Sequence, residues 1–227
     1  MLSTNLMSML LCIEGPDGGG KETQVAEFEK RLMAEGYPVK TMSFPRCDTP
    51  TGKLAKEYLT GKFGDPNSFS PWISSMFFCD DRLAAASQIK QYLSEGNVVV
   101  LNRYVPSNAA HQGGKINDPN ERKTFIKRIL RFEYEVLELP RPSLTVILDV
   151  TPEISLANLQ KRAVEKGLKL DGHETLVHIT NARDAYFTLQ RLYPEEFLLL
   201  VCGENGQMAP IGNIHEMIWQ IFRPYLP

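Results

Sequence analysis

The chain has few cysteines, no long hydrophobic run and no excess of charge of either sign. Its 227 residues include 4 Cys, and 25 Lys+Arg against 27 Asp+Glu leave a formal net charge of −2. A nearly neutral chain has no broad basic surface, so we expect no nucleic acid as its main partner. No apolar run approaches the roughly 18 residues that span a bilayer, so we expect a soluble protein without a membrane partner.

The cysteines are scattered and form no C-x-x-C pair, which argues against a zinc site or a redox motif. Three of the four lie in apolar or aromatic surroundings, which favour buried side chains, and such usage is typical of a reducing compartment. The segment Met1–Leu11 contains neither Lys nor Arg, unlike a signal or transit peptide. We therefore expect a cytoplasmic location.

Strand and helix patterns alternate along the chain, with no repeat and no linker long enough to divide it. Continuous apolar runs predict buried strands at Met9–Ile13, Val39–Ser43, Asn97–Leu101, Leu144–Val150 and Phe197–Val201. Helical periodicity predicts helices at Lys21–Glu35, Thr51–Thr60, Ser70–Glu95, Pro119–Leu137, Glu153–Lys166 and Thr175–Tyr193. Such runs are typical of parallel strands covered on both faces. The sequence thus predicts one α/β domain over residues 1–227, with ligand sites at the carboxyl ends of the strands.

A glycine-rich motif follows the first predicted strand and opens the first predicted helix: Glu14-Gly15-Pro16-Asp17-Gly18-Gly19-Gly20-Lys21-Glu22-Thr23. This is the setting that a G-x-x-x-x-G-K phosphate loop requires. Glycines let backbone N–H groups converge on phosphate oxygens, and the helix N-terminus adds the positive end of its dipole. Lys21 would add a mobile charge for the β- and γ-phosphates. A glycine-rich turn without a ligand is the alternative.

Further motifs extend through the chain in a fixed order. They are Phe44-Pro45-Arg46, Thr49-Pro50-Thr51-Gly52-Lys53-Leu54, Asp81-Arg82, Arg103-Tyr104-Val105, Ser107-Asn108-Ala109-Ala110-His111-Gln112-Gly113, Leu139-Pro140-Arg141-Pro142 and Leu148-Asp149-Val150. With the glycine-rich motif, they make the chain resemble the thymidylate kinases, a family of P-loop nucleoside monophosphate kinases, from Met9 to about Val201. The resemblance implies a three-layer P-loop kinase fold, with a parallel five-stranded sheet, helices on both faces and a short lid at about 162–174.

The resemblance also implies the reaction: Mg²⁺-dependent transfer of the γ-phosphoryl group of ATP to dTMP, giving dTDP and ADP for dTTP synthesis. The ATP phosphates would lie on the phosphate loop, 15–23, at Gly15, Asp17, Gly18, Gly19, Gly20, Lys21, Glu22 and Thr23. The family commonly forms homodimers through helices near Asp81-Arg82. The apolar stretch Trp72–Phe78 is compatible with that interface, although a buried core helix would look the same.

On the acceptor side, the resemblance assigns dTMP contacts to Asp17, Phe44, Arg46, Phe78, Arg82, Arg103, Asn108, Gln112 and Tyr186. Arg46 and Arg103 would clamp the acceptor phosphate, since a guanidinium presents a rigid charged fork. Asp17 would contact the sugar 3′-hydroxyl, and Tyr186 would close the sugar side.

At the base, Phe78 would stack on thymine, with Phe77 as the nearby alternative. Arg82 would donate to a base carbonyl, and Asn108 would contact the Watson–Crick edge, with support from Gln112. Each of these residues also has a structural explanation, as a surface ion pair for an arginine or as part of the core for an aromatic ring. His111 stands where family members often carry Tyr, and we assign it no acid–base role.

The phosphoryl-transfer side departs from the family pattern at three positions. Glu22 replaces the Ser or Thr that ligates Mg²⁺, Asn102 replaces the Asp of an Asp-Arg-Tyr triplet, and Gly172 replaces a lid arginine. Besides Lys21 and Arg103, the lid cations Lys166 and Lys169 are then the candidate catalytic residues. A lysine cannot reproduce the bidentate geometry of an arginine.

The first two departures cancel in charge, so we expect Glu22 to take over the carboxylate role at Mg²⁺, with Asn102 as its neutral neighbour. Asp149 either adds a carboxylate to the metal shell or caps the next helix, and we favour the cap. The departures also leave two other functions open: a nucleotide-binding relative with weak or no turnover, and a kinase for another deoxynucleoside or its monophosphate.

Overall fold

The centre of the molecule is a sheet of five parallel strands. This computed structural model describes residues 8–167, 174–204 and 206–227. In sheet order the strands are β2 (Val39–Ser43), β3 (Val98–Asn102), β1 (Met9–Glu14), β4 (Leu144–Asp149) and β5 (Phe197–Val201). All five predicted strands are present, and the predicted fold class is confirmed.

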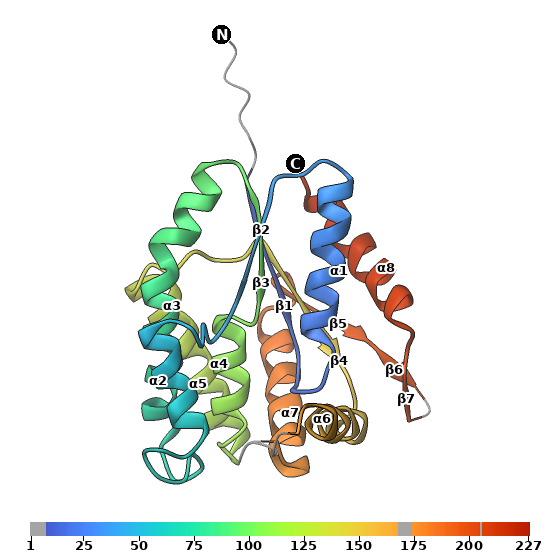
Figure 1. Ribbon diagram of the computed structural model, residues 1–227. Coiled ribbons are helices and arrows are strands. Elements are labelled where there is room, and N and C mark those ends of the chain that lie inside the picture. Colours follow the sequence, from blue (N-terminus) through green and yellow to red (C-terminus); the bar gives the residue numbers. More distant parts are fainter. Residues whose placement is uncertain (1–7, 168–173, 205) are drawn as a thin grey trace.

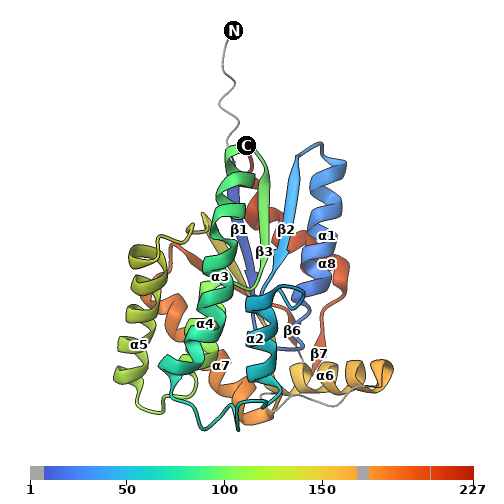
Figure 2. The ribbon, with the colours of Figure 1, turned by 60° about the vertical axis from the view of Figure 1, so that its left-hand side comes forward.

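Helices cover both faces of the sheet, as Figure 1 shows, with α1 and α8 on one side and α3, α4, α5 and α7 on the other. The helices are α1 (Lys21–Ala34), α2 (Pro50–Leu59), α3 (Pro71–Ser94), α4 (Val105–Gly113), α5 (Pro119–Arg131), α6 (Pro152–Lys166), α7 (Leu176–Leu192) and α8 (Ile211–Phe222). Both views place α2 and α6 near the end of the sheet where the strands finish (Figure 1, Figure 2). Among the described residues, no helix is both long and apolar enough to cross a membrane.

The strand sequences are continuously apolar because alternate residues enter two separate cores. In β1, Leu10 and Cys12 pack against the α3, α4, α5 and α7 side, whereas Leu11 and Ile13 pack against the α1 and α8 side. All four side chains are at most 3% exposed. A parallel strand that is buried on both faces therefore needs no polar alternation.

Helix α4 was not predicted, because it has nine residues, begins at a Val-Pro pair and ends in Gly113. The predicted helix Pro119–Leu137 is wrong at its end: α5 stops at Arg131, and Phe132–Val136 forms a π-helical turn. Simple periodicity does not reveal such a change, since the apolar spacing continues through it. It nevertheless turns Glu133 into the interior, with no exposed surface.

The C-terminal segment contains α8, which packs on α1. Phe28 of α1 contacts the rings of Trp219 and Phe222, with ring centroids 5.8 and 5.3 Å apart. The guanidinium of Arg31 lies 4.0 Å from the centre of the Trp219 ring. Helix α8 is therefore an integral part of the layer that covers this face of the sheet.

Replacing Phe222 with Ala should lower the free energy of unfolding by about 3–5 kcal/mol, because a fully buried ring is lost and a cavity remains. Urea denaturation followed by circular dichroism measures the change. The control is Tyr225→Ala, since Tyr225 is 40% exposed and should cost far less. Equal losses in the two variants would contradict the packing role of α8.

Candidate functional site

Two cavities open at the carboxyl ends of the strands and share two residues, Asp17 and Arg103. One cavity lies over the phosphate loop and α6, and we call it the donor cavity. The other lies between α3, α4 and the loop after β2, and we call it the acceptor cavity. A reaction between two bound molecules is possible where the cavities meet.

The backbone of the phosphate loop packs so closely that only glycine fits at two positions. Gly15 has φ +140°, and a Cβ there would lie 2.7 Å from the carbonyl oxygen of Leu148. Gly18 has φ +74°, and its Cβ would lie 2.2 Å from the carbonyl oxygen of Ser155 on α6. These glycines therefore fix the loop against β4 and α6, and α1 begins directly after it at Lys21.

Lys21 is buried inside the phosphate loop. Its Nζ donates hydrogen bonds to the carbonyl oxygens of Gly15 and Pro16, at 2.9 and 2.6 Å. Burial and the nearby charge of Arg103 lower the pKa of Lys21 from 10.5 to about 7, although Asp17 opposes them. Glu22 and Thr23 follow on the exposed first turn of α1 and line the donor cavity.

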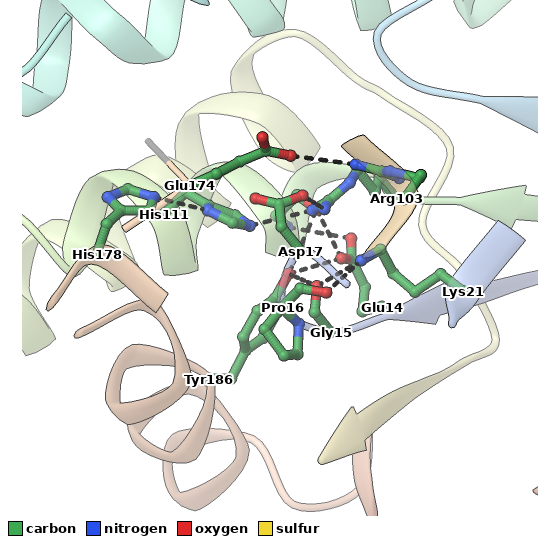
Figure 3. Close-up of polar contacts among 12 residues, drawn as sticks. Glu14, Gly15, Pro16, Asp17, Lys21, Arg103, His111, Glu174, His178 and Tyr186 are labelled. Atoms are coloured by element: carbon green, nitrogen blue, oxygen red, sulfur yellow. Dashed lines mark hydrogen bonds and ion pairs between the residues drawn. The ribbon is translucent and has the colours of Figure 1, made fainter. Parts of the chain in front are cut away.

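Arg103 stands between the cavities in a strained backbone conformation, with φ +64°. Its guanidinium forms an ion pair with Asp17, donates to Ser107 Oγ at 3.1 Å and contacts His111 Nε2 at 3.0 Å. Burial by itself would raise the pKa of Asp17, but the charge of Arg103 outweighs it and holds that pKa below its usual range. Figure 3 shows Asp17, Arg103 and His111 close together beside the phosphate loop.

His111 belongs to a stacked histidine pair. Its Nδ1 lies 3.1 Å from Nε2 of His178, and the ring centroids are 5.4 Å apart. His178 comes from the start of α7, so the pair joins α4 to α7 at the wall of the acceptor cavity (Figure 3). Burial lowers the pKa of both imidazoles, and that of His111 falls well below 6.5. Both rings are therefore held in the neutral form.

Glu14, directly before the loop, is fully buried and accepts several hydrogen bonds. The backbone N–H groups of Tyr104 and Ser107 donate to its Oε1 at 2.7 and 3.0 Å. The hydroxyls of Ser107 and Tyr186 donate to its Oε2 at 2.6 and 2.8 Å. Glu14 thereby fixes the first strand to α4 and α7.

The far end of the acceptor cavity combines aromatic and polar walls. Phe44 and Phe78 line it, whereas the alternative ring, Phe77, stacks on Tyr58 with centroids 4.7 Å apart and is not part of the wall. The polar side chains there are Arg82, Asn108 and Gln112. Each of these three side chains is at most 3% exposed, so none of them lies on the surface. Arg82 is therefore not the surface ion pair that the sequence left open as an alternative.

Two predicted acceptor residues do not line the cavity. Arg46 is bound to Asp81 of α3: its Nε and backbone N donate to the carboxylate at 3.0 and 2.7 Å. Tyr186 is 1% exposed and directs its hydroxyl to Glu14. Their predicted contacts with the acceptor phosphate and sugar stay predictions.

With this geometry in view, we compared the chain with known proteins. The family model for thymidylate kinase matches residues 13–209. A thymidylate kinase of Mycobacterium tuberculosis is 34% identical over 168 residues, 73% of this chain and 78% of the relative. The chain belongs to the thymidylate kinase family. The family resemblance seen in the sequence is thus confirmed.

Two other relatives extend the match along this thymidylate kinase family member. A thymidylate kinase of Caldanaerobacter subterraneus is 27% identical over 217 residues, 95% of each chain. A solved thymidylate kinase structure from Candida albicans superposes with a TM-score of 0.71, at 24% identity, over 96% of this chain and 92% of that one. The shared fold therefore includes the C-terminal segment.

A buried oxygen atom without a partner belongs to a residue in the wall of the donor cavity. Asn102 Nδ2 donates to Ser43 Oγ at 3.2 Å, and its buried Oδ1 has no hydrogen-bond partner among the described residues. Asn102 and Glu22 line the donor cavity together. Mg²⁺ prefers oxygen ligands and is usually held by one or two carboxylates with substrate phosphates. These residues therefore fit an Mg²⁺ site.

Asp149 forms an ion pair instead of capping α6. Both carboxylate oxygens bind the Arg183 guanidinium, at 2.6 and 3.0 Å. The favoured prediction of a helix cap is wrong, since Thr151 holds the N-cap position of α6 and makes no side-chain cap hydrogen bond. Arg183 on α7 neutralises the carboxylate instead.

The lid is only partly within the described residues. Lys166 ends α6 and is exposed, whereas Lys169 and Gly172 lie outside the described part of the chain. Arg162 of α6 donates to Glu174 at 3.1 Å, which links α6 to the segment before α7.

Sequence reasoning missed several residues of the site. Glu14 could have been found, because it begins the phosphate-loop motif, and Asp81 because it precedes Arg82 in a recognised pair. No sequence signal marks His178, Asn158 or Glu133. Asn158, for example, donates to the Gly18 carbonyl at 2.9 Å from a helix distant in sequence, a contact that only the fold creates.

The neutral histidine pair predicts a loss of stability in mild acid. Below about pH 6.5 the unfolded chain gains a proton at His111 that the folded chain resists, so the free energy of unfolding should fall as the pH drops. Each unit of pKa difference is worth about 1.4 kcal/mol. His111→Asn should flatten the decline between pH 7 and 5 in urea denaturation. His215→Asn, a less buried control, should flatten it less; an unchanged slope in His111→Asn would contradict the assignment.

Proposed function

We propose that this chain transfers the γ-phosphoryl group of ATP to dTMP, giving ADP and dTDP. The observation that carries the proposal is the meeting of the two cavities at Asp17 and Arg103, with a glycine-rich phosphate loop on one side only. The donor phosphates would bind along the loop and at Lys21, and the acceptor would enter the cavity lined by Phe78. The shared kinase family supports the same pairing of substrates.

The reaction needs positioning and charge neutralisation more than a general base. An acceptor phosphate already carries an anionic oxygen that can attack the γ-phosphorus. Arg103 stands where this oxygen and the γ-phosphate would meet, and Lys21 stands on the donor side. Asp17, paired with Arg103, would keep the guanidinium directed at this point until the phosphates take the place of Asp17 as its partners.

We propose Arg46 as a second positioning cation, because Pro45 beside it lines the acceptor cavity and Asp81 fixes its guanidinium. Tyr186 would act on the sugar side indirectly, through Glu14. From the lid, Lys166 and Lys169 would add charge over the transferred group. Mg²⁺, held by Glu22, Asn102 and the ATP phosphates, would neutralise charge on the donor.

All four cysteines are free thiols. They favour a reducing location, and we propose the cytoplasm.

A coupled assay of ADP release, with ATP, Mg²⁺ and in turn dTMP, dUMP, dGMP, thymidine or no acceptor, tests the function. We expect strong turnover with dTMP and weaker turnover with dUMP. Binding of ATP and dTMP without turnover would support the alternative, a nucleotide-binding relative that has lost catalysis.

Arg103→Lys should lower kcat/KM for dTMP by about 100-fold or more in that assay. Lysine keeps the charge but cannot contact Asp17, Ser107 and the two phosphates in one plane. Arg141→Lys is the matched control, since Arg141 is a half-exposed arginine paired with Glu196. A loss below threefold in Arg103→Lys would remove Arg103 from the proposed centre.

Glu22→Thr and Asn102→Asp test whether the two departures compensate for each other. Each single variant should weaken turnover and the Mg²⁺-dependent part of ATP binding, and the double variant should restore both. ATP titration with and without Mg²⁺ gives a readout that is independent of catalysis. Glu27→Thr, on the same helix but away from the donor cavity, is the control. Strictly additive effects would refute the compensation.

We also propose a homodimer through the outer face of α3. Trp72, Ile73 and Met76 are exposed there, and Ile73 is 54% accessible. Such a contiguous apolar face is typical of an interface. Ile73→Glu should convert a dimer to a monomer in analytical ultracentrifugation, and a wild-type monomer at micromolar concentration would exclude the proposal.

A further inference from the structure

Glu133 is a fully buried carboxylate beside the far end of the acceptor cavity, where the nucleobase of the acceptor would bind. It lies on the π-helical turn Phe132–Val136, a kind of turn that is frequent at functional sites. Its Oε2 accepts a hydrogen bond from Arg82 Nε at 2.6 Å. Its Oε1 accepts hydrogen bonds from Arg82 Nη2 at 2.7 Å and from Asn108 Nδ2 at 2.8 Å. One carboxylate thus binds two side chains that line the cavity.

This contact fixes the orientation of the Asn108 amide. A carboxylate only accepts hydrogen bonds, so the NH2 group must face Glu133, and it also donates to the Ser75 carbonyl at 3.3 Å. The amide oxygen, Oδ1, is left on the opposite side, buried and without a hydrogen-bond partner among the described residues. A buried acceptor of this kind is costly unless a ligand supplies an N–H or O–H group.

Arg82 offers the opposite polarity. A guanidinium has five N–H donors, and three are used: two on Glu133 and one, at 3.5 Å, on the carbonyl oxygen of Tyr104. Arg82 is one of the residues that line the cavity, and it has two N–H donors beyond these three. Held by Glu133, the wall therefore presents an N–H donor from Arg82 beside an oxygen acceptor from Asn108.

We propose that Glu133 is a positioning residue that sets the hydrogen-bond polarity of the base site. A pyrimidine with a 4-keto oxygen and an N3–H group satisfies both Arg82 and Asn108. A 4-amino pyrimidine instead places an amino group opposite Arg82, so that two donors face each other. Its unprotonated N3 lies opposite the Asn108 oxygen, so that two acceptors face each other. The inference rests on the proposed function, because it concerns the base of the same acceptor.

Wild-type protein provides the first test. dUMP and dCMP share sugar, phosphate and the lack of a 5-methyl group, and they differ only at positions 3 and 4 of the ring. We expect calorimetry to show dUMP binding about 100-fold more tightly, since a site built to bind a polar group strongly rejects a mispaired analogue. Equal affinities would overturn the proposal.

Glu133→Gln tests the residue itself. Glutamine has both a donor and an acceptor, so the Asn108 amide is free to turn and to offer its NH2 group to the cavity. The dUMP/dCMP affinity ratio should fall at least about tenfold, with dCMP binding more tightly than to wild type. A merely structural role would weaken both ligands alike. Glu135→Gln, an exposed glutamate on the same turn, is the control.

Removing the Glu133 charge leaves Arg82 unpaired in the interior, which threatens folding. The neutral double variant Arg82→Gln/Glu133→Gln avoids that charge, and it should lose discrimination as well. An unchanged ratio in either folded variant overturns the proposal. If wild type fails to phosphorylate dTMP, the proposed function fails; if it succeeds while the variants keep their ratio, only this inference fails.

Discussion

The hydrogen bonds to the buried carboxylate of Glu14 hold the two halves of the site in one frame. Glu14 ends β1 and immediately precedes the phosphate loop, so it fixes where the loop begins. It also accepts hydrogen bonds from the backbone N–H groups of Tyr104 and Ser107 at the N-terminus of α4. This helix carries Ser107, Asn108 and His111. A carboxylate is stabilised at a helix N-terminus, because the unsatisfied N–H groups and the helix dipole favour negative charge. The donor loop and the acceptor wall consequently share one anchor.

Around that anchor, the interior holds charges that balance locally. Asp17 pairs with Arg103 at the meeting point of the cavities, and Glu133 pairs with Arg82 at the far end of the acceptor cavity. Burying either partner alone would be strongly destabilising, whereas a pair with further hydrogen bonds is tolerated. The two pairs differ in accessibility. The Arg103 side chain is 17% exposed and lines both cavities, which suits it to contact phosphates that move during a reaction. The Arg82 side chain is 2% exposed, which suits it to hold its hydrogen-bond donors in a fixed arrangement.

The departures from the family pattern are concentrated on the donor side. Glu22 and Asn102 exchange a carboxylate between two positions of one cavity wall, and the buried Oδ1 of Asn102 has no hydrogen-bond partner among the described residues. The acceptor cavity instead has an aromatic and polar wall at Phe78, Arg82 and Asn108. The buried amide oxygen of Asn108 has no hydrogen-bond partner among the described residues, which is a cost to stability unless a ligand supplies a donor.

The sequence by itself determined the five strands, most of the helices between them, the phosphate loop and the family. The apolar run 144–148 and the glycines at 15–20 can be recognised within one short segment, because burial and backbone conformation constrain the residue types there. Only the tertiary structure decided the partners of Glu133, His178 and Arg46. Their contacts come from segments far apart in the chain, and the π-helical turn after α5 alters direction without altering periodicity. Which polar atoms are buried, paired or left free for a ligand depends on these long-range contacts, because burial and charge are properties of the assembled interior.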